Sequence, residues 1–147
     1  MYRILIALFL TVTVQAGGYT HEQNLSCSGR AHFNVTLTAY YPDFTSENES
    51  DYLDSRGKKL RALQDFIDGR AEYVTVAMDH IEKLPYGSTI CVPELNEHFR
   101  RMIPLQVRDH GLNLRSKGFS RLDICVRTEA DSYDNAVNRV VTLYTQT

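Results

Sequence analysis

Three aspartates lie where runs typical of β-strands end or are interrupted. Asp79 ends the run YVTVAMD, Asp109 ends IPLQVRD, and Asp123 stands inside RLDICV. Carboxylates at strand ends tend to converge on one rim of a sheet or barrel, where a rigid scaffold holds them. The alternative is a local role, because aspartate also bonds nearby backbone at strand ends. Two of these carboxyl groups in one groove could carry out acid–base chemistry.

The elements that must position these aspartates are short strands. Alternating or β-branched apolar residues predict six strands, at residues 31–41, 73–78, 88–92, 103–108, 122–127 and 139–144. The helical period occurs in residues 58–67, 94–102 and 131–138. These elements predict a mainly β fold, a small closed β-barrel decorated by helices, with a β-sandwich as the alternative. The only long loop candidate, residues 43–54, is acidic and either forms solvated surface or lines a site.

The alternation around Asp123 predicts which way its side chain points. Leu122, Ile124 and Val126 occupy every second position, and Asp123 and Cys125 lie between them. Successive side chains of a strand point to opposite faces. Asp123 is therefore expected to point away from the apolar face and into a groove, with Cys125 on the same face.

The composition limits the classes of partner. The chain has 147 residues, a formal net charge of −2 and 43% hydrophobic residues, which fits one domain with a packed core. It lacks the basic excess that nucleic-acid binding needs, so no nucleic-acid partner is expected. Its five His and three Cys show none of the close spacings of zinc motifs. We expect a monomer with neither a metal nor a cofactor.

The first residues have the pattern of a secretory signal. Arg3 precedes an apolar run at residues 4–14, and Ala16 offers a small residue for cleavage. The run is short for a membrane span, so the prediction is cleavage of residues 1–16, with an uncleaved anchor as the alternative. A single domain, residues 17–147, would then be secreted, to the exterior or to a bacterial periplasm, with no membrane attachment.

Export permits disulfides, and all three cysteines, Cys27, Cys91 and Cys125, remain in the mature chain. At most one bridge can form within the chain, and the three possible pairings stay open. Sequons for N-glycosylation occur at Asn24, Asn34 and Asn48 and matter only if the source is eukaryotic.

Ordered motifs over residues 36–144 resemble those of the three-aspartate (3D) domain family. They are TAY at 38–40, VAMD at 76–79, LPYGST at 84–89, VRDHG at 107–111, KG at 117–118, RLDI at 121–124 and VVTLY at 140–144. The resemblance implies a six-stranded double-psi β-barrel with short inserted helices. It also implies similarity to the catalytic domain of membrane-bound lytic transglycosylase A and to expansins and some secreted protease inhibitors.

Roles for individual residues follow from the same resemblance. Asp123 would be the catalytic acid/base and Asp109 its neighbouring carboxylate, with Asp79 and Lys117 as supporting residues. One carboxyl group would protonate the glycosidic oxygen and then act as base on the sugar's own C6 hydroxyl. A second carboxylate nearby would raise the pKa of that acid.

Aromatic side chains are the candidates for stacking on sugar rings: Tyr40, Tyr41, Tyr86 and Phe119, with packing in the core or at the rim as the alternative for each. The expected partner is a polysaccharide, peptidoglycan or a related glycan. The chain departs from the family in a longer segment between Asp109 and Asp123 and in lacking a second glycan-enclosing domain. Whether it is an enzyme therefore stays open. The rival hypothesis is a non-catalytic secreted binding module on the same barrel, an expansin-like glycan binder or a protease inhibitor.

Overall fold

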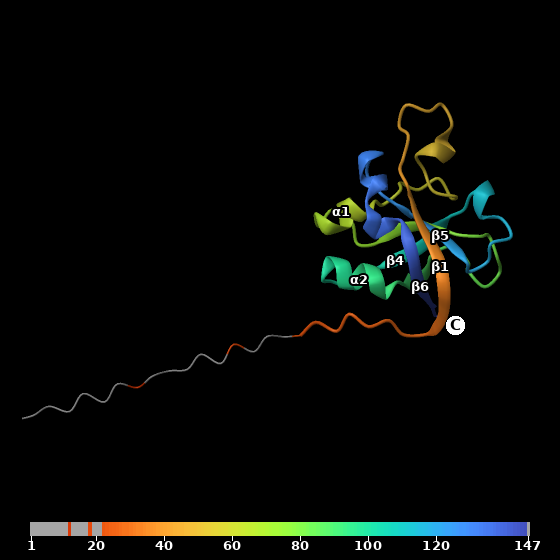
Figure 1. Cartoon of the computed structure of the whole chain (residues 1–147). Coiled ribbons are helices and arrows are strands. Elements are labelled where there is room, and N and C mark those ends of the chain that lie inside the picture. The colour runs from red at the N-terminus through yellow and green to blue at the C-terminus, as the bar shows by residue number, and fades with distance from the viewer. Residues whose placement is uncertain (1–11, 13–17, 19–21, 147) are drawn as a thin grey trace, which may run out of the picture.

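Six β-strands close into a barrel in a computed structural model that describes residues 12, 18 and 22–146 (Figure 1). The strands are β1 (Arg30–Tyr40), β2 (Val74–Ala77), β3 (Ser88–Cys91), β4 (Leu105–Asp109), β5 (Arg121–Cys125) and β6 (Arg139–Thr145). The predicted strands and the closed barrel are confirmed, and the sandwich alternative is wrong. The predicted leader, residues 1–16, lies outside the described residues except for Val12.

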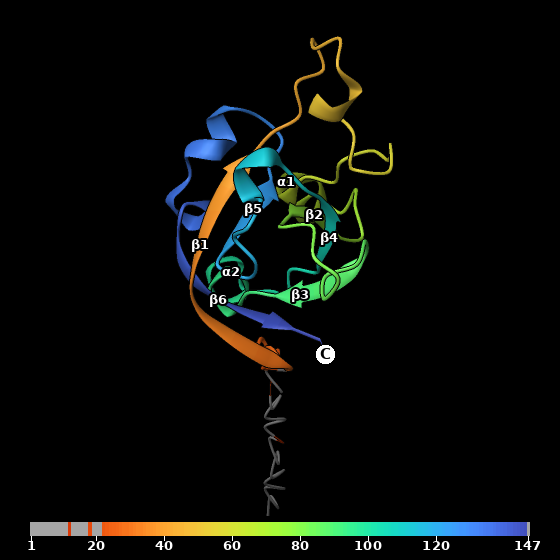
Figure 2. The ribbon, with the colours of Figure 1, turned by 90° about the vertical axis from the view of Figure 1, so that its right-hand side faces the viewer.

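The order of strands around the barrel is β1-β5-β2-β4-β3-β6 (Figure 2). Pairing is parallel between β1 and β5 and between β2 and β4, and antiparallel at the other four contacts. Exchanging β1 with β4, β2 with β5 and β3 with β6 leaves this ring of pairings unchanged. Parallel pairs need long crossover connections, and these connections carry the helices and turns.

The barrel interior is filled by the apolar face of each strand. Its fully buried residues include Leu37, Val74, Val76, Leu105, Leu122, Ile124 and Leu143. On β5, Leu122 and Ile124 belong to this core, whereas Cys125 packs in a separate cluster with Leu60 and Ala62. The predicted alternation on β5 is thus confirmed, and Asp123 points away from the barrel interior.

Two α-helices, α1 (Leu63–Ile67) and α2 (Pro93–Phe99), lie on one side of the barrel in Figure 1. Helix α1 is shorter than the predicted 58–67, because Lys59 forms a β-bridge with Leu53 and the backbone of Arg61 is hydrogen-bonded to Thr75 on β2. The predicted helix at 131–138 is wrong. Two 3₁₀ turns, η3 (Ala130–Tyr133) and η4 (Asn135–Val137), replace it, because Asp134 between them is extended and caps the second turn.

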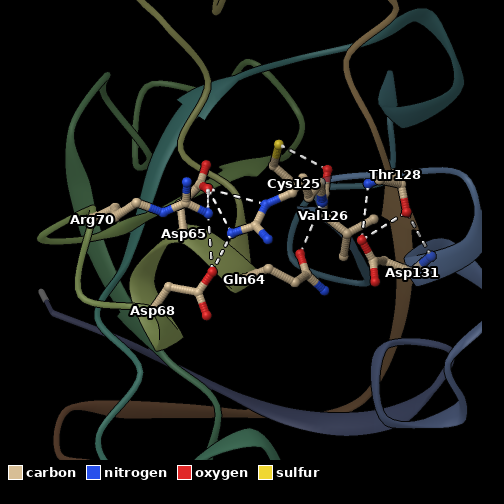
Figure 3. A network of polar contacts seen from close by, with 9 residues as sticks. Gln64, Asp65, Asp68, Arg70, Cys125, Val126, Thr128 and Asp131 are labelled. Atoms are coloured by element: carbon tan, nitrogen blue, oxygen red, sulfur yellow. Dashed lines mark hydrogen bonds and ion pairs between the residues drawn. The ribbon is translucent and has the colours of Figure 1, made fainter.

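A polar network fixes α1 to the chain that leaves β5 (Figure 3). The guanidinium of Arg127 lies 2.9 Å from Asp65 and 2.6 Å from Asp68, both on or next to α1. The backbone N–H of Arg127 also donates to the side chain of Gln64 at 2.9 Å. These contacts hold the helix against the chain just after β5.

A disulfide joins Cys27 to Cys91, which decides the pairing that the sequence left open. Cys125 is free and buried. Asn96, fully buried beside the bridge, donates to the carbonyl of Leu25 at 3.2 Å and accepts from the N–H of Ile103 at 2.8 Å. Within the described part of the chain, no helix is long and apolar enough to span a bilayer.

Candidate functional site

A groove of about 1390 Å³ lies between the barrel rim and the long loop that follows β1. The last residues of β1 and β4 reach it, as do the end of β2 and the face of β5 that points away from the core. Asp79, Asp109 and Asp123 all line this groove. The structure therefore brings together the three aspartates that the sequence pattern singled out.

Strand register explains why Asp109 and Asp123 line the same groove. Ala77, the last residue of β2, is the backbone partner of Asp109 on β4 and also of Asp123 on β5. Adjacent strands are about 4.8 Å apart, so the two aspartates lie roughly 10 Å apart at the backbone, with only β2 between them. A β-bulge between Val76 and Ala77 brings Asp109 into this register.

The carboxylate of Asp123 is largely enclosed, with its side chain 10% exposed. Its Oδ1 accepts from the hydroxyl of Thr38 on β1 and lies 3.4 Å from Nε of Arg121. Its Oδ2 accepts from the side-chain amide of Asn113 at 3.2 Å. Both oxygens are therefore occupied, and a positive charge lies beside them.

Asp109 has a different environment. Its Oδ2 accepts from the hydroxyl of Tyr40 at 3.0 Å, and its Oδ1 accepts from the backbone N–H of His110 at 3.0 Å. Burial raises the pKa of Asp109 above its ordinary value; these two hydrogen bonds oppose the shift and the nearby Asp54 carboxylate adds to it. A raised pKa is what a carboxyl group needs to donate a proton near neutral pH.

Tyr40 contacts Asp109 through its hydroxyl. Burial raises the pKa of the Tyr40 phenol well above its ordinary value, with further contributions from Cys125 and Asp109. The phenol is therefore a stable hydrogen-bond donor to Asp109. Tyr41, the next residue, is 39% exposed and lines the groove.

The predicted supporting residues occupy different places. Asp79 is buried and accepts from the backbone N–H of Gly118 at 2.9 Å, which fixes the turn that leads into β5. Lys117, in that turn, is exposed and lies outside the groove lining. Phe119 also lies outside the lining, since its ring stacks on His32 with centroids 4.1 Å apart and packs on the core.

Three partners of Asp123 were not predicted as site residues: Thr38, Arg121 and Asn113. Thr38 opens the TAY motif and pairs directly with Asp123 across β1 and β5, so its position two residues before Tyr40 was a usable signal. Asn113 is the middle residue of the 3₁₀ turn η2 (Leu112–Leu114), and no pattern in the sequence indicates its contact.

The lining of the groove is strongly acidic. Its carboxylates are Asp43, Glu49, Asp51, Asp54, Asp79, Asp109 and Asp123, and Arg115 is the one arginine or lysine among the lining residues. Such a surface repels polyanions. His80 and His110 also line it, with ring centroids 5.2 Å apart. No group of three His, Cys, Asp or Glu side chains in the described ranges could hold a metal ion.

Comparison with known proteins gives no assignment: no known family matches the chain, and no curated protein is significantly similar to it. The three-aspartate family therefore stays a hypothesis that rests on the ordered motifs.

Proposed function

We propose that this chain is an exported glycan-active protein that cleaves glycosidic bonds by lytic transglycosylase-type acid/base chemistry. The observation that carries the proposal is the convergence of Asp109 and Asp123 on one groove, where burial raises the pKa of Asp109. Perturbed carboxyl groups in a cleft are typical of acid/base sites.

The environments of the two carboxyl groups favour a division of roles that differs from the one implied by the family resemblance. Both carboxyl groups accept two or more hydrogen bonds, but only Asp123 lies beside a guanidinium, that of Arg121 at 3.4 Å, so Asp123 suits a fixed negative charge. Asp109 suits the proton donor. Asp109 would protonate the glycosidic oxygen, and Asp123 would stabilise positive charge developing at C1. The ionised Asp109 would then take the proton of the C6 hydroxyl as that oxygen attacks C1.

Two features support a double-psi barrel topology and export of the protein. The six-stranded ring with two parallel pairs related by strand exchange fits a double-psi barrel and the three-aspartate family. The Cys27–Cys91 bridge fits export to an oxidising compartment, because disulfides rarely persist in a reducing cytosol.

The groove also bears on the substrate. Tyr41 lines the groove and is partly exposed, so its ring offers a surface on which a sugar ring could stack. The carboxylates of the groove disfavour nucleic acids and other polyanions. Peptidoglycan is the first substrate to test, followed by chitin and cellulose.

A specific observation favours a second candidate, a non-catalytic glycan-binding module. The ion pair between Arg121 and Asp123 occupies the carboxylate that the family resemblance assigns to catalysis. Such a module would hold a glycan in the same groove without turnover.

Incubation of the mature protein with each glycan, followed by mass spectrometry of soluble products, tests the proposal. Asp109→Asn is expected to lower the rate by about 10²–10⁴-fold, the usual contribution of a general acid. Glu97→Gln, which removes an exposed carboxylate on α2 outside the groove, is the control and should keep the wild-type rate. A wild-type rate in Asp109→Asn would contradict the role of Asp109, and no product from any glycan would favour the binding module.

A further inference from the structure

The wall of the groove opposite the barrel rim is formed by one loop, residues 42–58, which rises above the barrel as the gold and yellow segment of Figure 2. Most of the hydrogen bonds of this loop are internal, such as those of Asp43 with Thr45 and Asp51. Its only helical turn is η1 (Glu49–Asp51). The position of this loop sets the width of the groove.

Only two residues of the loop form hydrogen bonds with the rest of the described chain. Asp54 accepts from Tyr86, and Ser55 donates to the backbone carbonyl of Arg108. These four residues are called the loop anchor below. Apart from its two covalent ends and the β-bridge of Leu53 with Lys59, the loop is tied to the barrel at the loop anchor, so its position depends on these hydrogen bonds.

Asp54 is the central residue of the loop anchor and is only 5% exposed. Its Oδ2 accepts from the hydroxyl of Tyr86 at 2.6 Å. Its Oδ1 accepts from the backbone N–H groups of Arg56 and Lys58 at 2.9 and 2.8 Å. One carboxylate thus fixes the fold of the loop's second half and joins it to the barrel.

The Tyr86 hydroxyl is held in a defined orientation. Nη1 of Arg108 donates to it at 3.2 Å, which leaves its own proton for Asp54. The guanidinium groups of Arg56 and Arg108 lie 4.2 and 5.1 Å from the centroid of the Tyr86 ring. Cation–π contacts of this kind restrict the ring.

The second half of the anchor ends next to the proposed acid. The N–H and the hydroxyl of Ser55 lie 3.2 and 2.8 Å from the carbonyl oxygen of Arg108, and the next residue is Asp109. The loop is therefore fixed to the peptide that immediately precedes Asp109.

We propose that Tyr86 is a positioning residue, which holds the loop at 42–58 as the second wall of the groove through Asp54. The inference rests on the proposed function only in naming a glycan as the ligand of the groove. Tyr86 acts through the loop and does not contact the reacting atoms.

Hydrogen exchange measured by mass spectrometry on the intact protein tests the anchor without any assumption about activity. Tyr86→Phe removes one hydroxyl and keeps the ring that contacts Arg56 and Arg108. The variant loses a hydrogen bond to a charged carboxylate, so the amide exchange rates of residues 42–58 should rise about ten- to a hundredfold. The exchange rates of the strands should stay unchanged. Asp54→Asn should act in the same direction. Unchanged exchange of the loop in Tyr86→Phe would overturn the proposal.

Tyr73→Phe is the matched control. The ring of Tyr73 also stacks on Arg108, at 4.3 Å, but its hydroxyl makes no hydrogen bond to the loop. Hydrogen exchange of residues 42–58 in Tyr73→Phe should equal that of the wild type. A rise as large as in Tyr86→Phe would contradict a role for the Tyr86 hydroxyl. If Tyr86→Phe does not fold, Ser55→Ala provides the same measurement on the other half of the anchor.

A kinetic measurement on the glycan that is cleaved separates positioning from a general structural effect. Tyr86→Phe is expected to raise KM about tenfold and to change kcat less than threefold, because the wall holds substrate and does not transfer protons. A fall in kcat with KM unchanged would contradict the inference. If no glycan is cleaved, the proposed function fails while the exchange measurement still decides the anchor.

Discussion

Breaking the Cys27–Cys91 disulfide should remove a large part of the stability of the barrel. The bridge joins the chain that precedes β1 to the end of β3, across 64 positions of sequence. Reduction breaks only this bond, because Cys125 is free. The folded contacts around Asn96 are expected to survive, so the main effect falls on the unfolded chain.

The size of the effect follows from the length of the closed loop. The chain-entropy expression for a loop of 64 residues gives about 14 cal/mol/K, or about 4 kcal/mol at room temperature. Domains of this size are stable by about 5–15 kcal/mol, so the reduced protein should be marginal.

Urea unfolding with and without a reducing agent measures the difference, in a Cys125→Ala background that prevents disulfide exchange. The reduced protein should lose about 4 kcal/mol of unfolding free energy. The double variant Cys27→Ser/Cys91→Ser should match it and should not respond to reductant. A difference below about 1 kcal/mol would refute the argument that the bridge stabilises by restricting the unfolded chain.

Three further predictions follow from particular side chains. Leu143→Ala removes a fully buried side chain and should cost about 2–5 kcal/mol in urea unfolding; a loss below about 1 kcal/mol would contradict its place in the core. Asn96→Ala leaves the N–H of Ile103 unpaired and should cost about 1–3 kcal/mol in the same assay, whereas a neutral result would contradict it. Burial raises the pKa of Asp109, so its ionised form is disfavoured in the folded state. Asp109→Asn should therefore raise the melting temperature near neutral pH. This gain should disappear at acidic pH, where Asp109 of the wild type is also neutral, and a gain independent of pH would contradict a raised pKa of Asp109.

The strands were predictable because one physical rule, alternation against a buried face, decides both their position and their orientation. Leu122 and Ile124 are buried in the barrel and Asp123 faces the groove, as their spacing predicts. The convergence of Asp79 and Asp109 with Asp123 was predictable to the same degree, because Asp79 and Asp109 lie at or just after strand ends and Asp123 lies on the outward face of β5.

Contacts between distant segments were not predictable in this way. The pairing of Cys27 with Cys91 depends on where β3 lies relative to the start of β1. The hydrogen bond from Tyr86 to Asp54 joins residues 32 positions apart, and an acidic loop gives no sign of its partner. Phe119 was a reasonable candidate for sugar stacking because it is aromatic, but its ring stacks on His32 and does not line the groove.

Digestion of peptidoglycan in oxygen-18 water, read by mass spectrometry, tests the central claim most directly. The proposed chemistry, in which the C6 hydroxyl of the sugar attacks C1, predicts anhydro-sugar ends that contain no oxygen-18, and predicts their loss in Asp109→Asn. Oxygen-18 at the new ends would show attack by water and contradict the transglycosylase step, and the absence of any product would contradict glycosidic cleavage by this groove.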